Sequence, residues 1–274
     1  MNPNEFLTTL NVPDLQLARE WMCDRLKARA ISDRVLGVMR ELPRHAFVPE
    51  IYRRLAYSDL DLWLPDAFVP SPEITARMFD LLDPTTIKSV LELVTGTGYG
   101  TCILTALGFE VHTVDYSPAH LANSSQALRG LALSVSSQRI GDPLDGWSEE
   151  APFDAIIVNG SIAQIPEQLI MQLREKTGML IAPIGFATGP QRLLLVRRGE
   201  NLSSQIFDLG PVVFPPLRSR AGGLFQDLPL SLFPNEVQVI EAQAIEAQVI
   251  EAQAIEAQVI EARVIEAQAT GPQM

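Results

Sequence analysis

The sequence predicts a doubly wound α/β fold, in which helices cover both faces of a largely parallel sheet. From Lys88 onward, short apolar runs alternate with helical patterns, and the runs lack the polar alternation of half-exposed strands. The first run leads directly into a glycine-bearing turn and a helix. With 274 residues, 47% of them hydrophobic and 20% charged, the chain can form a sizeable core. In such a fold the ligand crevice lies at the carboxyl ends of the strands.

The N-terminal region is expected to be helical and then irregular. Over residues 14–30, apolar side chains recur at helical spacing among charged ones, which predicts an amphipathic helix. A second helix is expected to begin at Ser32 and Asp33, which suit an N-cap, and to stop before Pro43. Residues 43–72 are rich in proline and aromatic side chains and have no regular period. We expect them to form a long ordered loop, the covering segment.

The alternating pattern places the sheet domain at residues 88–234, after an N-terminal region of residues 1–87. The expected strands are residues 89–94, 110–115, 133–140, 153–158, 179–184 and 192–196, with a last strand at 205–209 or 212–214. The expected helices run from the glycine turn to Leu107, from Ser117-Pro118 to about Arg129, and over residues 166–175. Gly178 suits the C′ position after the last of these helices.

Residues 235–274 are expected to form a separate low-complexity tail. Isoleucine recurs at every fifth position from Ile240 to Ile265, within VIEAQ and AIEAQ units. Five residues turn a helix by roughly 140° beyond a full circle, so these side chains reach every face and form no single apolar stripe. The tail is therefore expected to add nothing to the core, whether it is a neutral repeat expansion or a segment that binds a partner.

Charge and composition exclude several classes of protein. Lys and Arg number 21 against 33 Asp and Glu, a net charge of −12, which disfavours binding to nucleic acid or an anionic membrane. Two cysteines without a CxxC pair indicate a reducing compartment, and three histidines lack metal-ligand spacing, so no metal is expected. The N-terminus has no secretory pattern and no window is as apolar as a membrane span. We expect a cytoplasmic protein.

The residues that point to chemistry begin at the turn after the first strand. Gly96 and Gly98 allow the backbone to approach a ligand, and the next helix presents unpaired N–H groups to a phosphate or carboxylate. Asp115 ends the second strand, where it can accept hydrogen bonds from ribose hydroxyls. Asp142 follows the third strand, where its side-chain oxygen can meet an adenine amino group. Each feature alone also suits a tight connection or a helix cap. In this order they predict a nucleotide-cofactor site, and the G-x-G-x-G spacing disfavours a nicotinamide dehydrogenase.

Three blocks of sequence carry a more specific signal: R-H-A-F-V-P at 44–49, V-L-E-L-V-T-G-T-G-Y at 90–99 and A-P-F-D-A-I-I-V at 151–158. In combination, and with shorter matches between residues 31 and 217, they resemble the protein-L-isoaspartate O-methyltransferases. The resemblance implies a Rossmann-like methyltransferase fold that uses S-adenosylmethionine, with the N-terminal helices capping the site. It also implies that the cofactor is contacted by Thr95, Gly96, Thr97, Gly98, Asp115 and Asp142.

Two positions depart from that family's pattern. Val94 stands at the motif's first glycine, and a β-branched side chain is poorly tolerated where φ is positive. Pro70 stands at the family's active-site serine, which leaves Ser71, one residue later, as the candidate catalytic residue. The resemblance implies methylation of isoaspartyl or related carboxylates in a peptide or protein; the alternative is a non-catalytic binding protein with the same fold. Methyl transfer to a carboxylate needs no general base, because a carboxyl group with a pKa of about 4 is already ionised.

Overall fold

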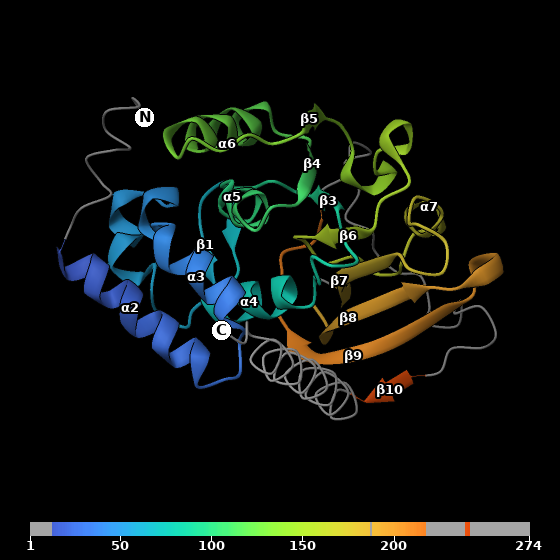
Figure 1. Ribbon diagram of the computed structural model, residues 1–274, viewed down its shortest axis with the longest axis horizontal. Helices are drawn as coiled ribbons and strands as arrows, with labels where there is room; N and C mark the ends of the chain where they lie inside the picture. The colour runs from blue at the N-terminus through green and yellow to red at the C-terminus, as the bar shows by residue number, and fades with distance from the viewer. Residues whose placement is uncertain (1–12, 187, 218–238, 242–274) are drawn as a thin grey trace, which may run out of the picture.

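The computed structural model describes residues 13–186, 188–217 and 239–241, which form one twisted sheet between two layers of helices (Figure 1). The strand order is β10-β9-β8-β7-β6-β3-β4-β5. The strands are β3 (Ser89–Leu93), β4 (Glu110–Asp115), β5 (Ser137–Ile140), β6 (Ala155–Val158), β7 (Met179–Gly185), β8 (Gln191–Arg198), β9 (Ser204–Val212) and β10 (Val239–Glu241). From β3 the chain winds outward on one side through β4 and β5, and on the other through β6 and β7. The switch point between β3 and β6 is where doubly wound sheets bind ligands.

The centre of the sheet is parallel and deeply buried. Strands β5, β4, β3, β6 and β7 pair in parallel. All four residues of β6 are buried, as are the last four of β3, which explains why β6 appears in the sequence as an unbroken apolar run and why only Glu92 interrupts the run in β3. Strand β8 departs from this pattern, because it runs antiparallel to both β7 and β9. Only residues 186–190 separate β7 from β8, too few for the crossover that a parallel pair requires.

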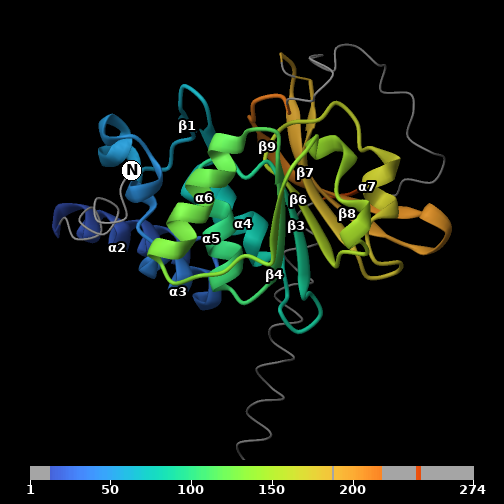
Figure 2. The ribbon, with the colours of Figure 1, turned by 90° about the horizontal axis from the view of Figure 1, so that it is seen from above.

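The helices lie in two layers, as Figure 2 shows from above. One face of the sheet is covered by α4 (Pro72–Asp80), α5 (Tyr99–Ala106) and α6 (Pro118–Gly130), with α2 (Pro13–Lys27) and α3 (Asp33–Glu41) outside them. The other face carries α7 (Glu167–Met171) and the 3₁₀ turns η3 (Pro143–Asp145) and η4 (Ser148–Glu150). Each layer has its own apolar core against the sheet. In the part of the chain that is described, no helix has the length and apolarity needed to cross a membrane.

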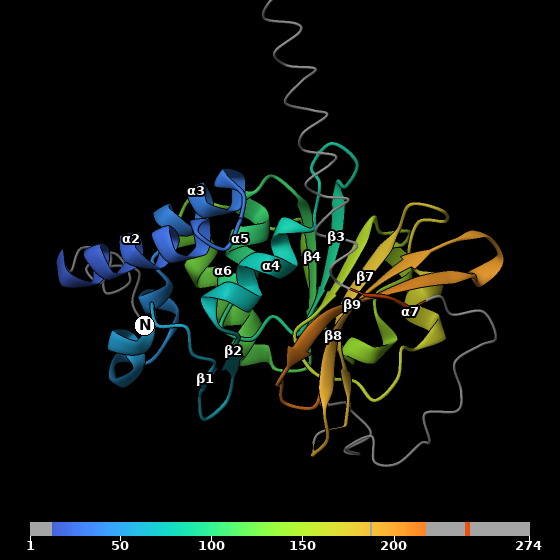
Figure 3. The same ribbon diagram turned by 90° about the horizontal axis from the view of Figure 1, so that it is seen from below.

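The covering segment is ordered, as expected, and a buried arginine fixes it. It holds the 3₁₀ turns η1 (Arg44–Phe47) and η2 (Glu50–Leu55) and the two short strands β1 (Leu62–Trp63) and β2 (Phe68–Val69), whose hairpin projects beside the end of α4 (Figure 3). The Arg44 guanidinium has no solvent exposure. It donates to the carbonyl oxygens of Ala56 at 2.8 Å and Pro70 at 2.6 Å, and lies 5.1 Å from the centre of the Tyr99 ring. The two ends of the segment are thus tied to the first turn of α5.

Three elements differ from the sequence expectations. Helix α4 was not expected, and it begins where Ser71 supplies an N-cap and Pro72 occupies the first turn. The helix expected over 166–175 ends at Met171, so Gly178 does not terminate it; the Gln172 side chain turns to the Trp147 amide instead. Within the expected tail, residues 235–238 and 242–274 lie outside the described residues, but β10 pairs in parallel with β9. The sheet therefore includes three residues assigned to the tail.

Candidate cofactor site

A cavity of about 210 Å³ opens at the carboxyl end of β3, beside the switch point. Its wall combines the covering segment, the inner face of α4, the turn after β3 and the loops that follow β4, β6 and β9. The lining residues are 63–70, Thr75, Met78, Phe79, 94–97, Tyr99, Gly100, Tyr116, His120, Asn159, Gly160 and 215–217. The sequence-predicted residues Thr95, Gly96 and Thr97 lie on this wall. The cavity occupies the position where the fold predicts a ligand.

The glycine turn has the backbone geometry that the sequence predicts. Gly96 and Gly98 have φ values of +55° and +83°, in the left-handed region that favours glycine. At Gly98 a Cβ atom would lie 2.7 Å from Cα of Ser124 in α6, so only glycine allows the two helices to approach this closely. Gly98 therefore acts behind the wall, as the N-cap of α5, while Gly96 faces the cavity. The start of α5 directs unpaired N–H groups to this side.

Val94 holds a strained conformation next to this turn. Its φ is +70°, a left-handed value that is a genuine outlier for a β-branched residue. Two hydrogen bonds hold it there: its N–H donates to the carbonyl of Val114 at 2.9 Å, and its carbonyl accepts from the Asn159 side chain at 3.0 Å. The backbone thus keeps the conformation that a glycine would adopt freely, at a strain of about 1–3 kcal/mol.

The buried carboxyl group of Glu92 is the centre of a hydrogen-bond network next to the glycine turn. Glu92 accepts from the hydroxyls of Thr101 at 2.5 Å and Thr113 at 3.0 Å, and from the Asn159 amide at 3.1 Å. Burial raises the pKa of Glu92 to about 7, with a further rise from the charge of Asp115, while the three hydrogen bonds oppose the shift. The network joins β3, β4, α5 and the loop after β6.

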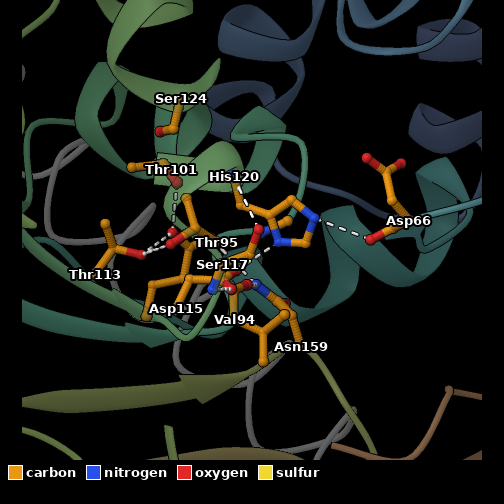
Figure 4. A network of polar contacts seen from close by, with 12 residues as sticks. Asp66, Val94, Thr95, Thr101, Thr113, Asp115, Ser117, His120, Ser124 and Asn159 are labelled. Atoms are coloured by element: carbon orange, nitrogen blue, oxygen red, sulfur yellow. Dashed lines mark hydrogen bonds and ion pairs between the residues drawn. The ribbon is translucent and has the colours of Figure 1, made fainter. Parts of the chain in front are cut away.

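Asp115 lies at the end of β4, as expected, but is fully buried. Its Oδ2 accepts from the Gly96 N–H at 3.0 Å and lies 3.0 Å from the ring Nδ1 of His120; its Oδ1 accepts from the Ser117 N–H at 2.8 Å. Figure 4 shows these contacts around the carboxylate. The side chain that faces the cavity at this point is His120 rather than Asp115. Asp115 thus orders the glycine turn, and the His120 ring covers Asp115.

Asp142 and Ser71 lie away from the cavity wall and cap short helices. The Asp142 carboxylate accepts from the Leu144 N–H at 3.0 Å, at the start of η3. The Ser71 hydroxyl accepts from the Ile74 N–H at 3.4 Å at the start of α4, and the Ser71 N–H donates to Asp61 at 2.7 Å. Neither residue is among those that line the cavity. The adenine contact of Asp142 and the catalytic role of Ser71 remain predictions.

Sequence reasoning missed several polar residues of the wall. His120, Asn159 and Thr75 line the cavity, and each comes from a different element. A usable signal existed for two of them. His120 is in the first turn of a helix that directly follows a candidate binding acid, and Asn159 directly follows a buried parallel strand, so both had to lie near the switch point. Thr75 gave no signal, because α4 itself was not expected.

The wall suits a nucleoside cofactor with an amino-acid end. Gly96 leaves open the space a side chain would occupy, and the nearest atom to a Cβ there is the Phe68 carbonyl oxygen at 3.7 Å. Aromatic side chains for packing against a flat base come from Tyr116, Trp63 and Phe68. In the described residues no group of three His, Cys, Asp or Glu side chains is arranged to hold a metal ion.

Comparisons with known proteins identify a family and a shared fold. Residues 18–222 match the family described as protein-L-isoaspartate(D-aspartate) O-methyltransferase (PCMT). Protein-L-isoaspartate O-methyltransferase 2 of Shewanella sediminis is 36% identical over 74% of this chain and 84% of that protein. The protein-L-isoaspartate O-methyltransferase of Halorhodospira halophila is 39% identical over 75% and 94%. A putative Plasmodium falciparum protein-L-isoaspartate O-methyltransferase, solved with S-adenosyl-L-homocysteine, shares the fold, with a TM-score of 0.61 and 22% identity over 73% of this chain and 98% of that one.

Proposed function

The chain belongs to the protein-L-isoaspartate(D-aspartate) O-methyltransferase family, and from that premise we propose that it transfers a methyl group from S-adenosylmethionine to isoaspartyl carboxylates of proteins. The observation that carries the proposal is the glycine turn after β3, whose residues 95–97 line a cavity at the switch point of the sheet. A family match over most of the chain and a cavity at the expected end of β3 point to the same activity.

The cofactor, when bound, supplies an activated methyl group on a sulfonium. We assign its charged amino-acid end to Gly96 and Thr97, which line the cavity, and to the N–H groups at the start of α5. Asp115 is the acceptor for its ribose hydroxyls and Asp142 the acceptor for its adenine amino group. Because a carboxylate is already ionised at neutral pH, the protein needs only to position the acceptor oxygen and exclude water.

The substrate carboxylate must lie at the side of the cavity formed by the covering segment and α4. We assign its positioning to Ser71, which lies outside the cavity wall but directly follows the lining residue Pro70. Its hydroxyl oxygen accepts from Ile74, and its hydrogen can be donated to a carboxylate that lies next to Pro70 at the edge of the cavity. Pro70, which takes the place of the family's serine, has a carbonyl held by the buried Arg44 at 2.6 Å. That contact fixes the loop and with it the position of Ser71. The proposed role of the reaction is protein repair in the cytoplasm, since isoaspartyl linkages are damaged forms of ordinary peptide bonds.

A methyl-transfer assay tests the proposal. The full-length chain is incubated with S-adenosylmethionine and either an isoaspartyl peptide or the same peptide with a normal aspartyl residue. We expect a base-labile methyl ester on the isoaspartyl peptide alone, detected as a mass increase of one methylene group. Cofactor binding without ester formation on either peptide would leave the family fold but contradict this substrate. The non-catalytic alternative predicts no ester on any carboxylate.

A further inference from the structure

The ring of His120 connects the candidate cofactor acid to the covering segment. His120 lies in the first turn of α6, and its Nδ1 is 3.0 Å from Oδ2 of Asp115 at the end of β4. Its Nε2 is 2.9 Å from the backbone carbonyl oxygen of Asp66, in the turn between β1 and β2. Figure 4 shows the ring between these two groups. One side chain therefore joins the sheet to the segment that covers the cavity.

Both partners of the ring accept hydrogen bonds and donate none. A backbone carbonyl has no hydrogen to give, so Nε2 must donate to Asp66, and Nδ1 faces the Asp115 carboxylate, whose two oxygens already accept from the N–H groups of Gly96 and Ser117. Both ring nitrogens of His120 must then donate, so the ring is an imidazolium. The ionisable groups that act on it are the two acids Asp115 and Asp66; the hydrogen bond to Asp115 is the largest cause that raises its pKa, and burial opposes the rise.

The same ring separates Asp115 from the cavity. Asp115 has no exposed surface, whereas His120 is one of the residues that line the wall. The other two groups on the carboxylate are backbone N–H donors of Gly96 and Ser117, fixed by the turn and by the start of α6. The cavity of about 210 Å³ is also smaller than the roughly 300–1,000 Å³ of most small-molecule sites. Of the three groups that hydrogen-bond to Asp115 in the described part of the chain, His120 is therefore the one that a side-chain rotation can remove.

We propose that His120 is a latch on the cofactor site: its imidazolium ring covers Asp115 and fastens the covering segment, and it leaves Asp115 when the ribose hydroxyls bind there. The proposal rests on the proposed function, because it concerns entry of the same cofactor. Opening breaks the Nδ1–Asp115 and Nε2–Asp66 hydrogen bonds together, so it also frees the β1–β2 turn from the sheet.

The latch makes cofactor binding depend on pH. In the closed state the His120 ring binds its proton more tightly than a histidine exposed to water does. The closed state is therefore fully favoured below the ordinary histidine pKa of about 6.5, and it weakens as the pH rises through the raised pKa of the ring. Binding removes the carboxylate partner and therefore releases a proton. We expect the affinity for the cofactor to rise between pH 6 and pH 8.5. The rise is roughly tenfold for each unit by which closure raises the pKa of the His120 ring.

Calorimetric titration of the full-length chain with S-adenosylmethionine and with S-adenosylhomocysteine tests the latch. The proteins are the wild type, His120→Ala and the control His112→Gln, whose ring contacts Ser137 outside the cavity wall. We expect His120→Ala to bind both ligands severalfold more tightly than the wild type at pH 6.5, with a flatter pH profile, and His112→Gln to match the wild type. The neutral sulfur of the second ligand separates the latch from repulsion between the ring and the sulfonium.

Weaker binding by His120→Ala, or the same pH profile in both proteins, would overturn the latch and leave the proposed function intact. No binding by either protein at any pH would overturn both. A second readout needs no ligand: the His120 ring resonance, assigned by its absence from His120→Ala, is expected to titrate above pH 6.5, and at a lower pH in Asp115→Asn. A ring that titrates at the same pH in both proteins contradicts the closed imidazolium.

Discussion

At the scale of single residues, Val94 shows how the fold imposes a conformation that its sequence opposes. Its backbone makes the bonds to Val114 and Asn159 that order the turn, and these bonds set φ at +70°. The half-buried Val94 side chain packs against the apolar core on the face of the sheet that carries α7. Part of the stability gained by that packing is offset by backbone strain.

Comparison of Val94→Gly with Val94→Ala separates strain from packing. Both variants lose the isopropyl group, but only glycine adopts a positive φ freely. We expect Val94→Gly to be more stable than Val94→Ala by about 1 kcal/mol, because relief of roughly 1–2 kcal/mol of left-handed strain exceeds the added entropy of the unfolded chain. Urea unfolding of both variants measures the difference. Equal stability, or a more stable alanine variant, would show that the valine backbone is unstrained. We also expect Val94→Gly to bind S-adenosylmethionine more tightly than the wild type.

Glu92 makes stability depend on pH. Its pKa of about 7 in the folded protein exceeds the ordinary value of 4.5, so the folded state binds the proton more tightly than the unfolded state. The contribution of this group is present in full below about pH 4.5 and is lost as the pH rises through 7. We expect the free energy of unfolding of the wild type, relative to Glu92→Gln, to fall by about 2 to 3 kcal/mol between pH 4.5 and pH 8. A difference between the two proteins that does not change with pH would contradict the buried, high-pKa carboxyl group.

At the scale of elements, the packing of α5 on α6 sets the position of the glycine turn. The two helices follow neighbouring strands, β3 and β4, and pack tightly where Gly98 meets Ser124. The Asp115 carboxylate links the same two elements through the N–H groups of Gly96 and Ser117. A shift of α5 away from α6 would therefore move the turn that faces the cavity.

Gly98→Ala tests that packing, with Gly108→Ala as its matched control. Both glycines have positive φ, +83° and +88°, but a Cβ at Gly98 would lie 2.7 Å from Ser124 Cα, whereas no atom lies within 4 Å of one at Gly108. We expect Gly108→Ala to cost about 1 kcal/mol and Gly98→Ala about 1–3 kcal/mol more, from overpacking. Thermal unfolding measures both. Similar losses in the two variants would mean that the helices can separate without cost.

At the scale of the whole molecule, the sequence predicts the parallel centre well and the rest less well. Strands β3, β4, β6 and β7 and helices α5 and α6 lie within a few residues of their expected bounds, because buried parallel strands and capped helices leave strong local patterns. Helix α4 is not predicted, since it is short and follows a proline-rich stretch. Strand β8 lies close to its expected bounds, but its antiparallel direction is not predicted, because strand direction depends on connections rather than on composition.

The sequence predicts where on the sheet the candidate site lies, but not which side chains contact one another there. Gly96 and Asp115 fall at the expected ends of β3 and β4, since residue spacing fixes where parallel strands end. That Asp115 is covered by His120 depends on the side-chain direction in the first turn of α6 and on where the covering segment folds back. Both are tertiary facts without a local pattern. Ser71 and Asp142 are N-cap residues. Short polar residues before prolines commonly cap helices without any catalytic role.

The edge of the sheet gives a prediction for the C-terminal repeat. Strand β10 pairs with β9 over Val239–Glu241, so it covers part of the edge of β9. We expect a chain that ends at Glu241 to match the full-length protein within about 0.5 kcal/mol. A chain that ends at Gln238 should lose about 1 kcal/mol and aggregate more readily, because it exposes the β9 edge. Urea unfolding and light scattering compare the two. Equal behaviour of both truncated chains would show that β10 contributes nothing to the sheet.

The central claim is that the cavity beside the glycine turn binds S-adenosylmethionine although Val94 replaces a glycine and His120 covers Asp115. Calorimetric titration of the full-length protein at pH 8, where the latch is weakened, tests it most directly. We expect one molecule of cofactor per chain with a dissociation constant in the micromolar range, about −8 kcal/mol, and at least tenfold weaker binding by Asp115→Ala, as expected for loss of a charge-assisted hydrogen bond. Absence of heat and of any thermal shift at millimolar cofactor would contradict the claim and leave a methyltransferase fold without its cofactor.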